Sequence, residues 1–352
     1  MNKFQFKSAG LLYFMALFTV YGFQSESKEL YQELEVNPNV MVEIENQFGD
    51  LTLSSWDQNK VSIAVRITVK GTNPSRIQEK LNEIDVDFML SPERVKAQTI
   101  VEEGWGFKWL KSSRLNYQID YHVKLPKSAA INIENNYGSI VLNELEGKAV
   151  IRCDYGKLLL GDLLHEDNFL SFDYTSNSSI DFIKGGTIHA DYSSFEVSEA
   201  GVISLKADYT QSKFTTLKNL EFKNDYGKLT IEQINQLKGS GDFLTLRAAK
   251  VFQNIALNQE FGSIRIDSLN PTVTSVTIDS EYTGINLGLD PNWDFTYEIH
   301  LEFASLKSNV ALQHQIQKEG GTEKNYKGYS ILENSSNKLQ IDSEFGSVKL
   351  NY

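Results

Sequence analysis

The sequence predicts an all-β fold: a single-chain β-helix or solenoid with coils of about 18 residues. A short pattern recurs along the chain, in which an acid or amide precedes Tyr or Phe and a small residue follows. Its best-matched copies are Asp154–Leu158 and Asp225–Leu229. The segments on both sides of the aromatic residue alternate apolar and polar residues, as half-buried strands do. Self-similarity at a period near 20 residues is typical of stacked repeats.

The aromatic residue marks each repeat, and successive markers are 17 to 21 residues apart. Stacked strands lie about 4.8 Å apart, so we expect the ten markers to form a column roughly 45 Å long. The chain has no proline between Pro126 and Pro271, which favours uninterrupted sheet over this stretch. The markers are Tyr137, Tyr155, Tyr174, Tyr192, Tyr209, Tyr226, Phe243, Phe261, Tyr282 and Phe303.

The alternation changes phase at each aromatic residue, which indicates a corner between two strands. The residue after the aromatic is Gly in several copies, but it is Thr175, Ser193 or Thr210 in others. Because Thr is strongly disfavoured at positive φ, we infer that this position requires small size rather than positive φ. Small size indicates a close approach of neighbouring coils. Leu244, which follows Phe243, does not fit this interpretation.

Residues 1–25 have the features of a secretory signal peptide. Lys3 and Lys7 precede an apolar run that ends near Gly22, and small and polar residues follow. We expect cleavage between Gly22 and Ser25. No cysteine follows the run, which argues against a lipoprotein anchor, and we expect no transmembrane anchor in the mature chain. The expected location is the periplasm, the outer-membrane surface or the extracellular space.

Residues 26–130 are predicted to hold an opening coil and an N-terminal capping region. Val42–Leu53 closely resembles Ile131–Leu142, so we expect it to form the opening coil. Between these two segments, four alternating stretches predict a capping sheet. A short helix is predicted as well, with Asn73 as N-cap and Pro74 at its first position. Its apolar residues Ile77, Leu81 and Ile84 share one face. Residues 131–352 are predicted to form the repeat array and its closing coils.

The charge and the cysteine content exclude some functions. The formal net charge is −12, and it becomes about −14 if Lys3 and Lys7 leave with the signal peptide. Such a charge repels nucleic acid, so we expect no nucleic-acid partner. Cys153 is the only cysteine and alternates with apolar residues. We therefore expect it to be a small buried core residue rather than a catalytic thiol.

Two groups of aromatic residues are candidate binding surfaces. The first is the column itself, represented by Tyr155, Tyr174, Tyr192, Tyr209 and Tyr226, whose exposed rings could stack on sugars or on partner side chains. The alternative is that these rings stack only on one another. The second group is Trp105, Phe107 and Trp109, which would form either an exposed hairpin tip or a covered part of the cap.

The acids that precede the aromatics form a second column. A calcium ladder is one interpretation, because carboxylates are hard ligands. The Gly-Gly-x-Gly-x-Asp spacing of calcium-binding solenoids is absent, however, and Asn136 occupies one of the positions. We predict instead that these side chains cap backbone amides at the corners. The histidines show no metal-binding spacing, so we predict neither a metal site nor a cofactor.

The same acids raise the question of polysaccharide cleavage, which uses a pair of carboxylates in a cleft. Neighbouring acids in any such column lie at a suitable distance, so their proximity does not indicate catalysis. We predict no enzymatic activity. A carbohydrate-active β-helix enzyme remains the alternative.

Several motifs together resemble a known family. A strand ending in "HVKLP" precedes "INIENNYGSIVL", serial "YGxL" and "FGxI" units follow, and the chain ends near "EFGSVKL". This pattern, from Val42 to Leu350, resembles the bacterial putative-adhesin family of β-helical repeat domains, which are exported proteins of unknown function. The resemblance implies a single β-helix-like domain in the cell envelope, with no catalytic residues to carry over.

We therefore expect an exported, non-enzymatic β-solenoid that acts as an adhesin-like binding or structural module of the bacterial cell envelope. Its expected partner is an envelope polysaccharide or another envelope protein. Besides the enzyme, a second alternative is a periplasmic protein-interaction partner in envelope signalling.

Overall fold

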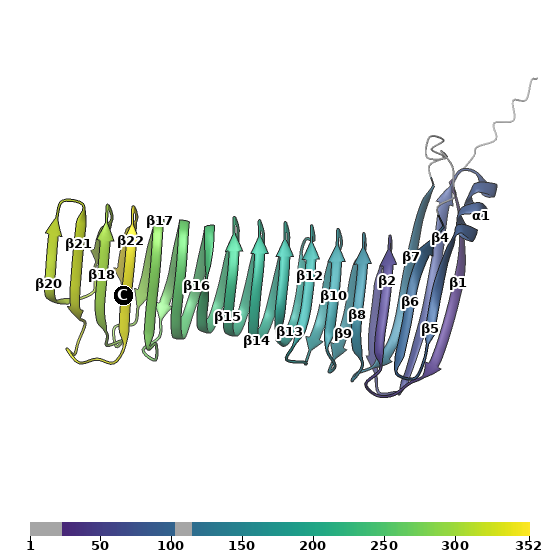
Figure 1. Cartoon of the computed structure of the whole chain (residues 1–352), viewed down its shortest axis with the longest axis horizontal. Helices are drawn as coiled ribbons and strands as arrows, with labels where there is room; N and C mark the ends of the chain where they lie inside the picture. The colour runs from purple at the N-terminus through teal and green to yellow at the C-terminus, as the bar shows by residue number, and fades with distance from the viewer. Residues whose placement is uncertain (1–22, 103–114) are drawn as a thin grey trace, which may run out of the picture.

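Strands stacked side by side make up nearly the whole chain, in an elongated array (Figure 1). The structure is a computed structural model that describes residues 23–102 and 115–352. The fold is all-β and solenoid-like, as the sequence predicts. Within the described residues α1 (Pro74–Glu83) is the one α-helix.

The strands fall into an N-terminal group, a central array and a C-terminal group. The N-terminal strands are β1 (Gln24–Glu35), β2 (Met41–Gln47), β3 (Leu51–Trp56), β4 (Lys60–Gly71), β5 (Ile84–Leu90), β6 (Arg94–Val101) and β7 (Asn116–Pro126). The central strands are β8 (Ala130–Asn136), β9 (Ser139–Leu145), β10 (Ala149–Asp154), β11 (Lys157–Leu163), β12 (Asn168–Asp173), β13 (Ser178–Asp191), β14 (Ser194–Asp208), β15 (Gln211–Asp225), β16 (Lys228–Leu269) and β17 (Ser275–Leu289). The C-terminal strands are β18 (Thr296–Glu302), β19 (Ser305–Ser308), β20 (Gln313–Gly320), β21 (Glu323–Tyr329), β22 (Lys338–Glu344) and β23 (Ser347–Asn351).

Parallel pairing in constant register connects the coils of the array. One ladder runs through β8, β10, β12 and β13, and a second runs through β9, β11 and β13. From β13 to β15 each strand pairs along most of its length with the next one. Equivalent residues of successive repeats are therefore neighbours in space.

The core lies between the two faces of each coil and is built by the apolar half of the alternation. One inward column contains Ile151, Leu170, Ile188 and Leu205, which are consecutive partners in the register. All four are at most 2% exposed. Residues that alternate with them point to solvent, so the repeat builds a continuous apolar interior with polar outer faces.

The N-terminal strands extend the array beyond its first coil. β6 and β7 pair in parallel with β2 and β3 of that coil, while β1, β4 and β5 add antiparallel pairs outside them. The predicted helix is confirmed: the side chain of Asn73 accepts a hydrogen bond from the Arg76 amide, and Pro74 opens the helix. Ile77 and Leu81 are buried where α1 packs on β4, β1 and β5.

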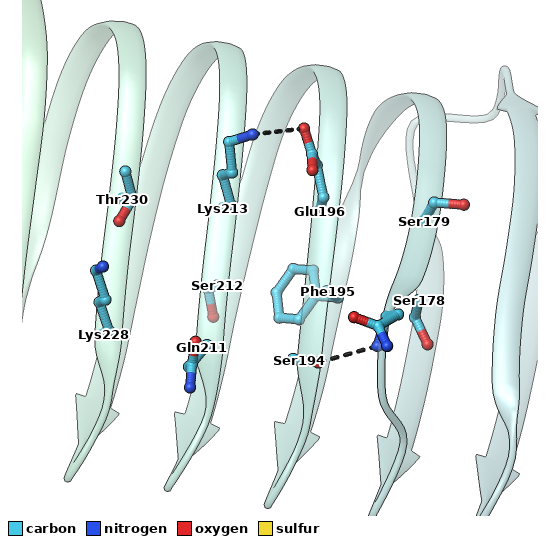
Figure 2. A pocket seen from close by; sticks show the side chains of 11 residues that line it. Ser178, Ser179, Ser194, Phe195, Glu196, Gln211, Ser212, Lys213, Lys228 and Thr230 are labelled. Atoms are coloured by element: carbon cyan, nitrogen blue, oxygen red, sulfur yellow. Dashed lines mark hydrogen bonds and ion pairs between the residues drawn. The ribbon is translucent and has the colours of Figure 1, made fainter.

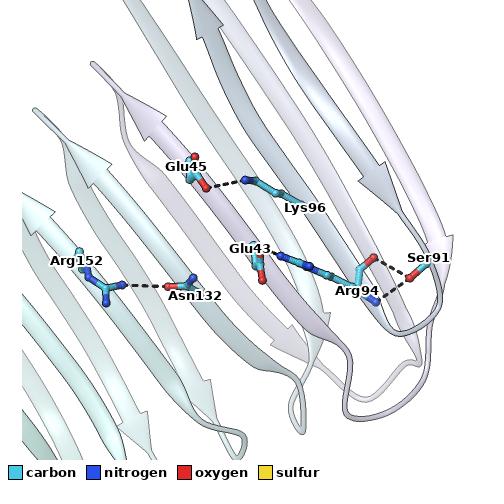
Figure 3. Close-up of polar contacts among 7 residues, drawn as sticks. All are labelled: Glu43, Glu45, Ser91, Arg94, Lys96, Asn132 and Arg152. Carbon is cyan, nitrogen blue, oxygen red and sulfur yellow. Dashed lines mark hydrogen bonds and ion pairs between the residues drawn. The ribbon is translucent and has the colours of Figure 1, made fainter.

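Charged side chains accompany the backbone pairing between this group and the first coil. Arg94 on β6 contacts Glu43 on β2 at 2.8 Å, and Lys96 contacts Glu45 at 2.8 Å (Figure 3). Such pairs between adjacent strands contribute modestly to stability.

The order of the last coils differs from the order of the sequence. The sequence spacing predicts that the coil of Phe303 follows that of Tyr282. Instead β22 lies between β17 and β18, and β23 lies between β17 and β19. The C-terminal segment is therefore inserted into the stack, while the β20–β21 hairpin pairs with the outer side of β18. Spacing alone could not reveal this, because both segments carry the same repeat pattern.

Candidate functional site

The aromatic residues of the repeat form one continuous ladder along an edge of the array. Consecutive rings are stacked, with centroids 4.8 to 5.1 Å apart and interplanar angles of at most 10°. We call this set the aromatic ladder. In spatial order its members are Phe48, Tyr137, Tyr155, Tyr174, Tyr192, Tyr209, Tyr226, Phe243, Phe261, Tyr282, Phe345 and Phe303.

Each ladder residue adopts a left-handed backbone conformation, with φ between 49° and 63°. The positive φ of the aromatic residue was not predicted from the sequence, where φ was considered only for the residue that follows it. Left-handed φ costs an L-residue about 1–2 kcal/mol, and an aromatic side chain offers no local compensation. The stacking of each ring on its neighbours offsets this cost, so the ladder fixes the corners.

Hydrogen bonds continue from coil to coil through the corner. The amide of Tyr155 donates to the carbonyl of Asp173, 3.0 Å away, and equivalent bonds recur along the ladder. The prediction that the acids bond backbone amides is confirmed for Asp173, Asp191 and Asp225, but each amide belongs to the next coil and not to the same corner. The Asp173 carboxylate accepts from the Asp191 amide at 3.2 Å, and the Asp191 carboxylate accepts from the Asp208 amide at 3.1 Å. These carboxylates hold the next coil in register.

Two positions of each corner face the same space in the interior of the coil. One is the residue directly after the aromatic, and the other is the residue two positions before the aromatic. A side chain at Gly156 would meet the Cys153 sulfur at 2.9 Å, and one at Gly227 would meet the Asn224 side-chain oxygen at 2.3 Å. In these two corners a larger residue before the aromatic is accompanied by Gly after it. The neighbouring coil is close as well, because a side chain at Gly156 would also meet the Gly138 carbonyl oxygen at 2.0 Å. Small size is therefore needed at these two positions, whereas Gly262, after Phe261, has a positive φ of 140°.

The same relationship explains Leu244, which did not fit the sequence pattern. The residue two before Phe243 is Gly241, and a side chain at Gly241 would lie 3.0 Å from the Leu244 Cδ2 atom. Leu244 therefore fills space that Gly241 leaves empty. Ala207, a small residue, is likewise accompanied by Thr210, which is fully buried. In both corners a small side chain before the aromatic is accompanied by a larger side chain after it.

The ladder presents ring edges and hydroxyl groups to solvent, not ring faces. Tyr155, Tyr174, Tyr192, Tyr209 and Tyr226 are all about half exposed, at 49% to 52%. Both faces of each ring are covered by the rings above and below. The expected stacking of a sugar on a ring face is therefore blocked in the interior of the ladder. The sequence could not show this, because the orientation of each ring depends on its neighbours.

The hydroxyls of Tyr155 and Tyr192 stay protonated at neutral pH. Partial burial raises the pKa of Tyr155, and the neighbouring tyrosines Tyr174 and Tyr137 raise it further. The pKa of Tyr192 is raised by the same causes, with Tyr209 and Tyr174 as its neighbours. Each hydroxyl can then donate and accept a hydrogen bond.

A polar groove lies on the strand segments that follow Tyr174, Tyr192, Tyr209 and Tyr226 (Figure 2). We call it the ladder groove, and its volume is about 330 Å³. Its lining residues are Asn177, Ser178, Ser179, Ser194, Phe195, Glu196, Gln211, Ser212, Lys213, Lys228 and Thr230.

The register aligns the outward residues of the groove in columns. Ser194 pairs with Gln211, which pairs with Lys228, and each lies two residues after a ladder tyrosine. A second column places Glu196 beside Lys213, and these two side chains form an ion pair of 2.8 Å (Figure 2). The groove thus offers hydroxyl, amide and ammonium groups beside the tyrosine hydroxyls.

The floor of the groove combines an aromatic ring with a buried hydroxyl. Phe195 is buried and packs edge-on against Phe172 and Phe214. Beside it in the register, Ser212 is 2% exposed, and its hydroxyl has no hydrogen-bond partner among the described residues. An unpaired buried hydroxyl is costly, so a ligand or a water molecule that bonds to it would gain stability.

The sequence analysis found the ladder residues but not the groove. Ser178 and Ser212 stand in an inward column that is otherwise apolar, next to Phe195. These two serines, at positions where other repeats carry Leu158 or Leu229, were the available signal. Trp105, Phe107 and Trp109 lie outside the described residues. Among those described, no cluster of three or more His, Cys, Asp or Glu side chains is placed to hold a metal ion.

No family model matches the chain, and no curated protein matches its sequence. Similar solved structures include putative adhesins, the kind of protein that the sequence motifs resemble. One from Parabacteroides merdae has a TM-score of 0.29 and 9% identity, and one from Parabacteroides distasonis has 0.28 and 7%. A putative lipid binding protein from Parabacteroides distasonis has 0.26 and 11%. Each match covers 92% of this chain and 96% of the other. At such scores the likeness supports no conclusion about what this chain binds.

The described part of the chain contains no helix with the length and apolar character needed to cross a membrane.

Proposed function

We propose that the chain is an exported, non-enzymatic binding module of the bacterial cell envelope, which presents the ladder groove and the adjoining tyrosine hydroxyls to a polysaccharide. The observation that carries this proposal is the column of Ser194, Gln211 and Lys228 along the groove, each two residues after a ladder tyrosine. It places hydroxyl, amide and ammonium groups beside a row of tyrosine hydroxyls.

The chemistry of the groove suits a polyhydroxylated ligand. Ser194, Gln211 and the tyrosine hydroxyls each donate and accept hydrogen bonds, as sugar hydroxyls do. Because the ring faces are covered, recognition would use these polar edges, with Phe195 as a small apolar floor. A rigid array in constant register would offer the tyrosine hydroxyls at regular intervals to successive units of a polymer.

Binding is favoured over cleavage by the charges that line the groove. Glycoside hydrolysis uses two carboxyl groups that flank the scissile bond. Of the eleven lining residues one, Glu196, carries a carboxylate, and it is paired with Lys213. The acids next to the ladder accept hydrogen bonds from backbone amides and serve the fold.

Export is part of the proposal, with residues 1–25 as the leader region and residues 131–352 as the binding array. The first strand refines the cleavage site, because β1 begins at Gln24 and pairs with β4 from that residue onward. Cleavage after Gly22 leaves β1 whole, whereas cleavage after Ser25 removes its first two residues. We therefore favour Gly22, which the mass of the exported protein would test.

A glycan array followed by matched tyrosine variants tests the binding function. The Tyr192→Phe/Tyr209→Phe double variant keeps the ladder but removes two hydroxyls beside the groove. The Tyr137→Phe/Tyr282→Phe variant makes the same chemical change away from it. We expect selective glycan binding that only the first pair weakens, by roughly tenfold for two lost hydrogen bonds. The proposal would be contradicted if the chain bound none of the glycans, or if both double variants lost the same amount of glycan affinity.

A further inference from the structure

A second hollow lies on the strand segments that precede the ladder residues Tyr192, Tyr209, Tyr226 and Phe243. We call it the lysine hollow, and its volume is about 690 Å³. It is lined by His189, Ser204, Leu205, Lys206, Glu221, Phe222, Lys223, Lys238, Gly239, Ser240, Ala256, Leu257, Asn258 and Thr277. The lysine hollow and the ladder groove therefore flank the same stretch of the ladder from its two sides.

A missing side chain lets an aromatic ring form part of the floor of this hollow. Gly239 follows Phe222 in the inward column that includes Leu205. A Cβ atom at Gly239 would lie 2.4 Å from the Phe222 ring, so the ring occupies the space that a side chain would fill. Phe222 and Leu257 are each 5% exposed and form an apolar floor that reaches the surface.

Positive charge is concentrated on the walls of the hollow. Lys206 and Lys223 are partners in the register and point outward, and Lys238 lies on the next strand segment. The single carboxylate of the lining, Glu221, pairs with Lys238 at 2.8 Å. This surplus of cations stands in a chain whose formal net charge is −12.

Lys206 and Lys223 differ from several lysines on the neighbouring coils. Lys148, Lys184 and Lys213 form ion pairs with Asp or Glu. Neither Lys206 nor Lys223 has an ion pair within the described part of the chain, although both are exposed. The backbones of two lysines on adjacent strands lie about 4.8 Å apart, and their ammonium groups repel each other. An anion between the two ammonium groups would therefore be favoured.

We propose that the lysine hollow binds the anionic groups of an acidic polysaccharide, with a sugar ring over the floor of Phe222 and Leu257. This deepens the proposed function by naming the ligand class, and it rests on the view of the array as a polymer-binding scaffold. An ammonium group is a point charge that attracts carboxylate and sulfate alike. The shared chemistry is therefore an anion carried by a polysaccharide.

Calorimetric titration of the purified full chain tests this, with polygalacturonate as the carboxylate polymer, dextran sulfate as the sulfate polymer and dextran as the neutral one. The test variant is Lys206→Gln/Lys223→Gln. The matched control is Lys307→Gln/Lys349→Gln, a second pair of exposed lysines that are partners in register, on β19 and β23. Both variants change the net charge equally, and circular dichroism checks their folding.

We expect an acidic polymer to bind in preference to dextran, with an affinity that falls as salt is added. The test variant should bind it about tenfold more weakly, as expected for two exposed ion pairs, while the control binds as the unmodified chain does. Stronger binding of polygalacturonate than of dextran sulfate identifies the carboxylate as the anion, and the reverse order identifies sulfate.

Three results would overturn the inference: equal weakening in both variants, no preference for either acidic polymer, or tighter binding to phosphatidylglycerol vesicles than to both polymers. The Tyr192→Phe/Tyr209→Phe variant separates this site from the ladder groove. If the lysines govern binding of acidic polymers while no glycan depends on the tyrosines, the ladder-groove proposal fails and the lysine hollow stands.

Discussion

The ring of Phe345 stacks on that of Tyr282, with centroids 4.8 Å apart and an angle of 8° between the rings. In the sequence, the repeat of Phe303 comes between them. The C-terminal segment therefore closes the array by insertion, and Phe345 carries ladder neighbours on both faces. The coil of Phe303 and the β20–β21 hairpin depend on this inserted segment for their contact with the rest of the array.

The first prediction concerns this insertion. The Phe345→Ala substitution removes two stacked contacts, whereas Phe303→Ala removes one. Each contact is worth about 0.5–1.5 kcal/mol beyond the buried area, so Phe345→Ala should lower the free energy of unfolding about twice as much. Urea denaturation measures the difference. Both residues have φ of 50°, so the backbone effect of Ala is the same in both variants. Equal losses would show that Phe345 is not held between two rings.

The second prediction tests the left-handed corner. In an ordinary strand, Gly is less stable than Ala. At Tyr209, where φ is 52°, the order should be reversed, and Tyr209→Gly should be about 1 kcal/mol more stable than Tyr209→Ala. Both variants lose the ring equally. Thr245, an exposed strand residue without positive φ, is the control position. There the Ala variant should be more stable than the Gly variant. Chemical denaturation measures the free energy of unfolding of the four variants. If the Ala variant were more stable at both positions, the corner would not be strained.

The sequence predicted those parts of the fold that depend on a local pattern. The strand alternation, the corner at each aromatic and the helix after Asn73 follow from neighbours in the sequence. The matching of Gly156 to Cys153 was not predicted, although both residues lie in the same corner.

The remaining features depend on contacts between repeats. The insertion of Phe345 could not be predicted, because every coil presents the same edge to its neighbours. The positive φ of the tyrosines was missed because Tyr has no intrinsic preference for it, and stacking between coils supplies the compensation. The ladder groove and the lysine hollow were missed because each is formed by several coils in register, around Ser212 and Gly239 respectively.

The third prediction tests the exchange of size across the corner. Ala207→Asn places a larger side chain opposite Thr210 and should destabilise the fold by about 1–3 kcal/mol through overpacking. Adding Thr210→Gly copies the neighbouring corner, in which Asn224 is accompanied by Gly227. We expect the double variant to be less destabilised than the two single effects summed, with a coupling of about 0.5–3 kcal/mol.

A double-mutant cycle in urea measures this coupling. Thr210→Gly alone also loses the hydrogen bond that its hydroxyl accepts from the Ser193 amide, so each single variant has its own cost. Additive effects would mean that the two positions do not share one space. The control cycle pairs Ala207→Asn with Thr245→Gly, on the outer face, where we expect no coupling.

The last prediction concerns Cys153, which is fully buried in the array. Burial and, to a lesser extent, the nearby Asp154 carboxylate raise the pKa of its thiol to about 12. The thiolate is the reactive form, so at pH 8 alkylation of the folded chain should be negligible, while the unfolded chain reacts at the rate of an ordinary cysteine. Mass spectrometry after iodoacetamide treatment, with and without urea, measures this.

Because the pKa of the Cys153 thiol is higher in the folded chain than in the unfolded chain, raising the pH from 8 through 12 should favour unfolding. The unfolded thiol loses its proton first. Cys153→Ser keeps the size of the side chain and serves as the control for this pH dependence, and rapid labelling of the folded chain at pH 8 would refute the buried position.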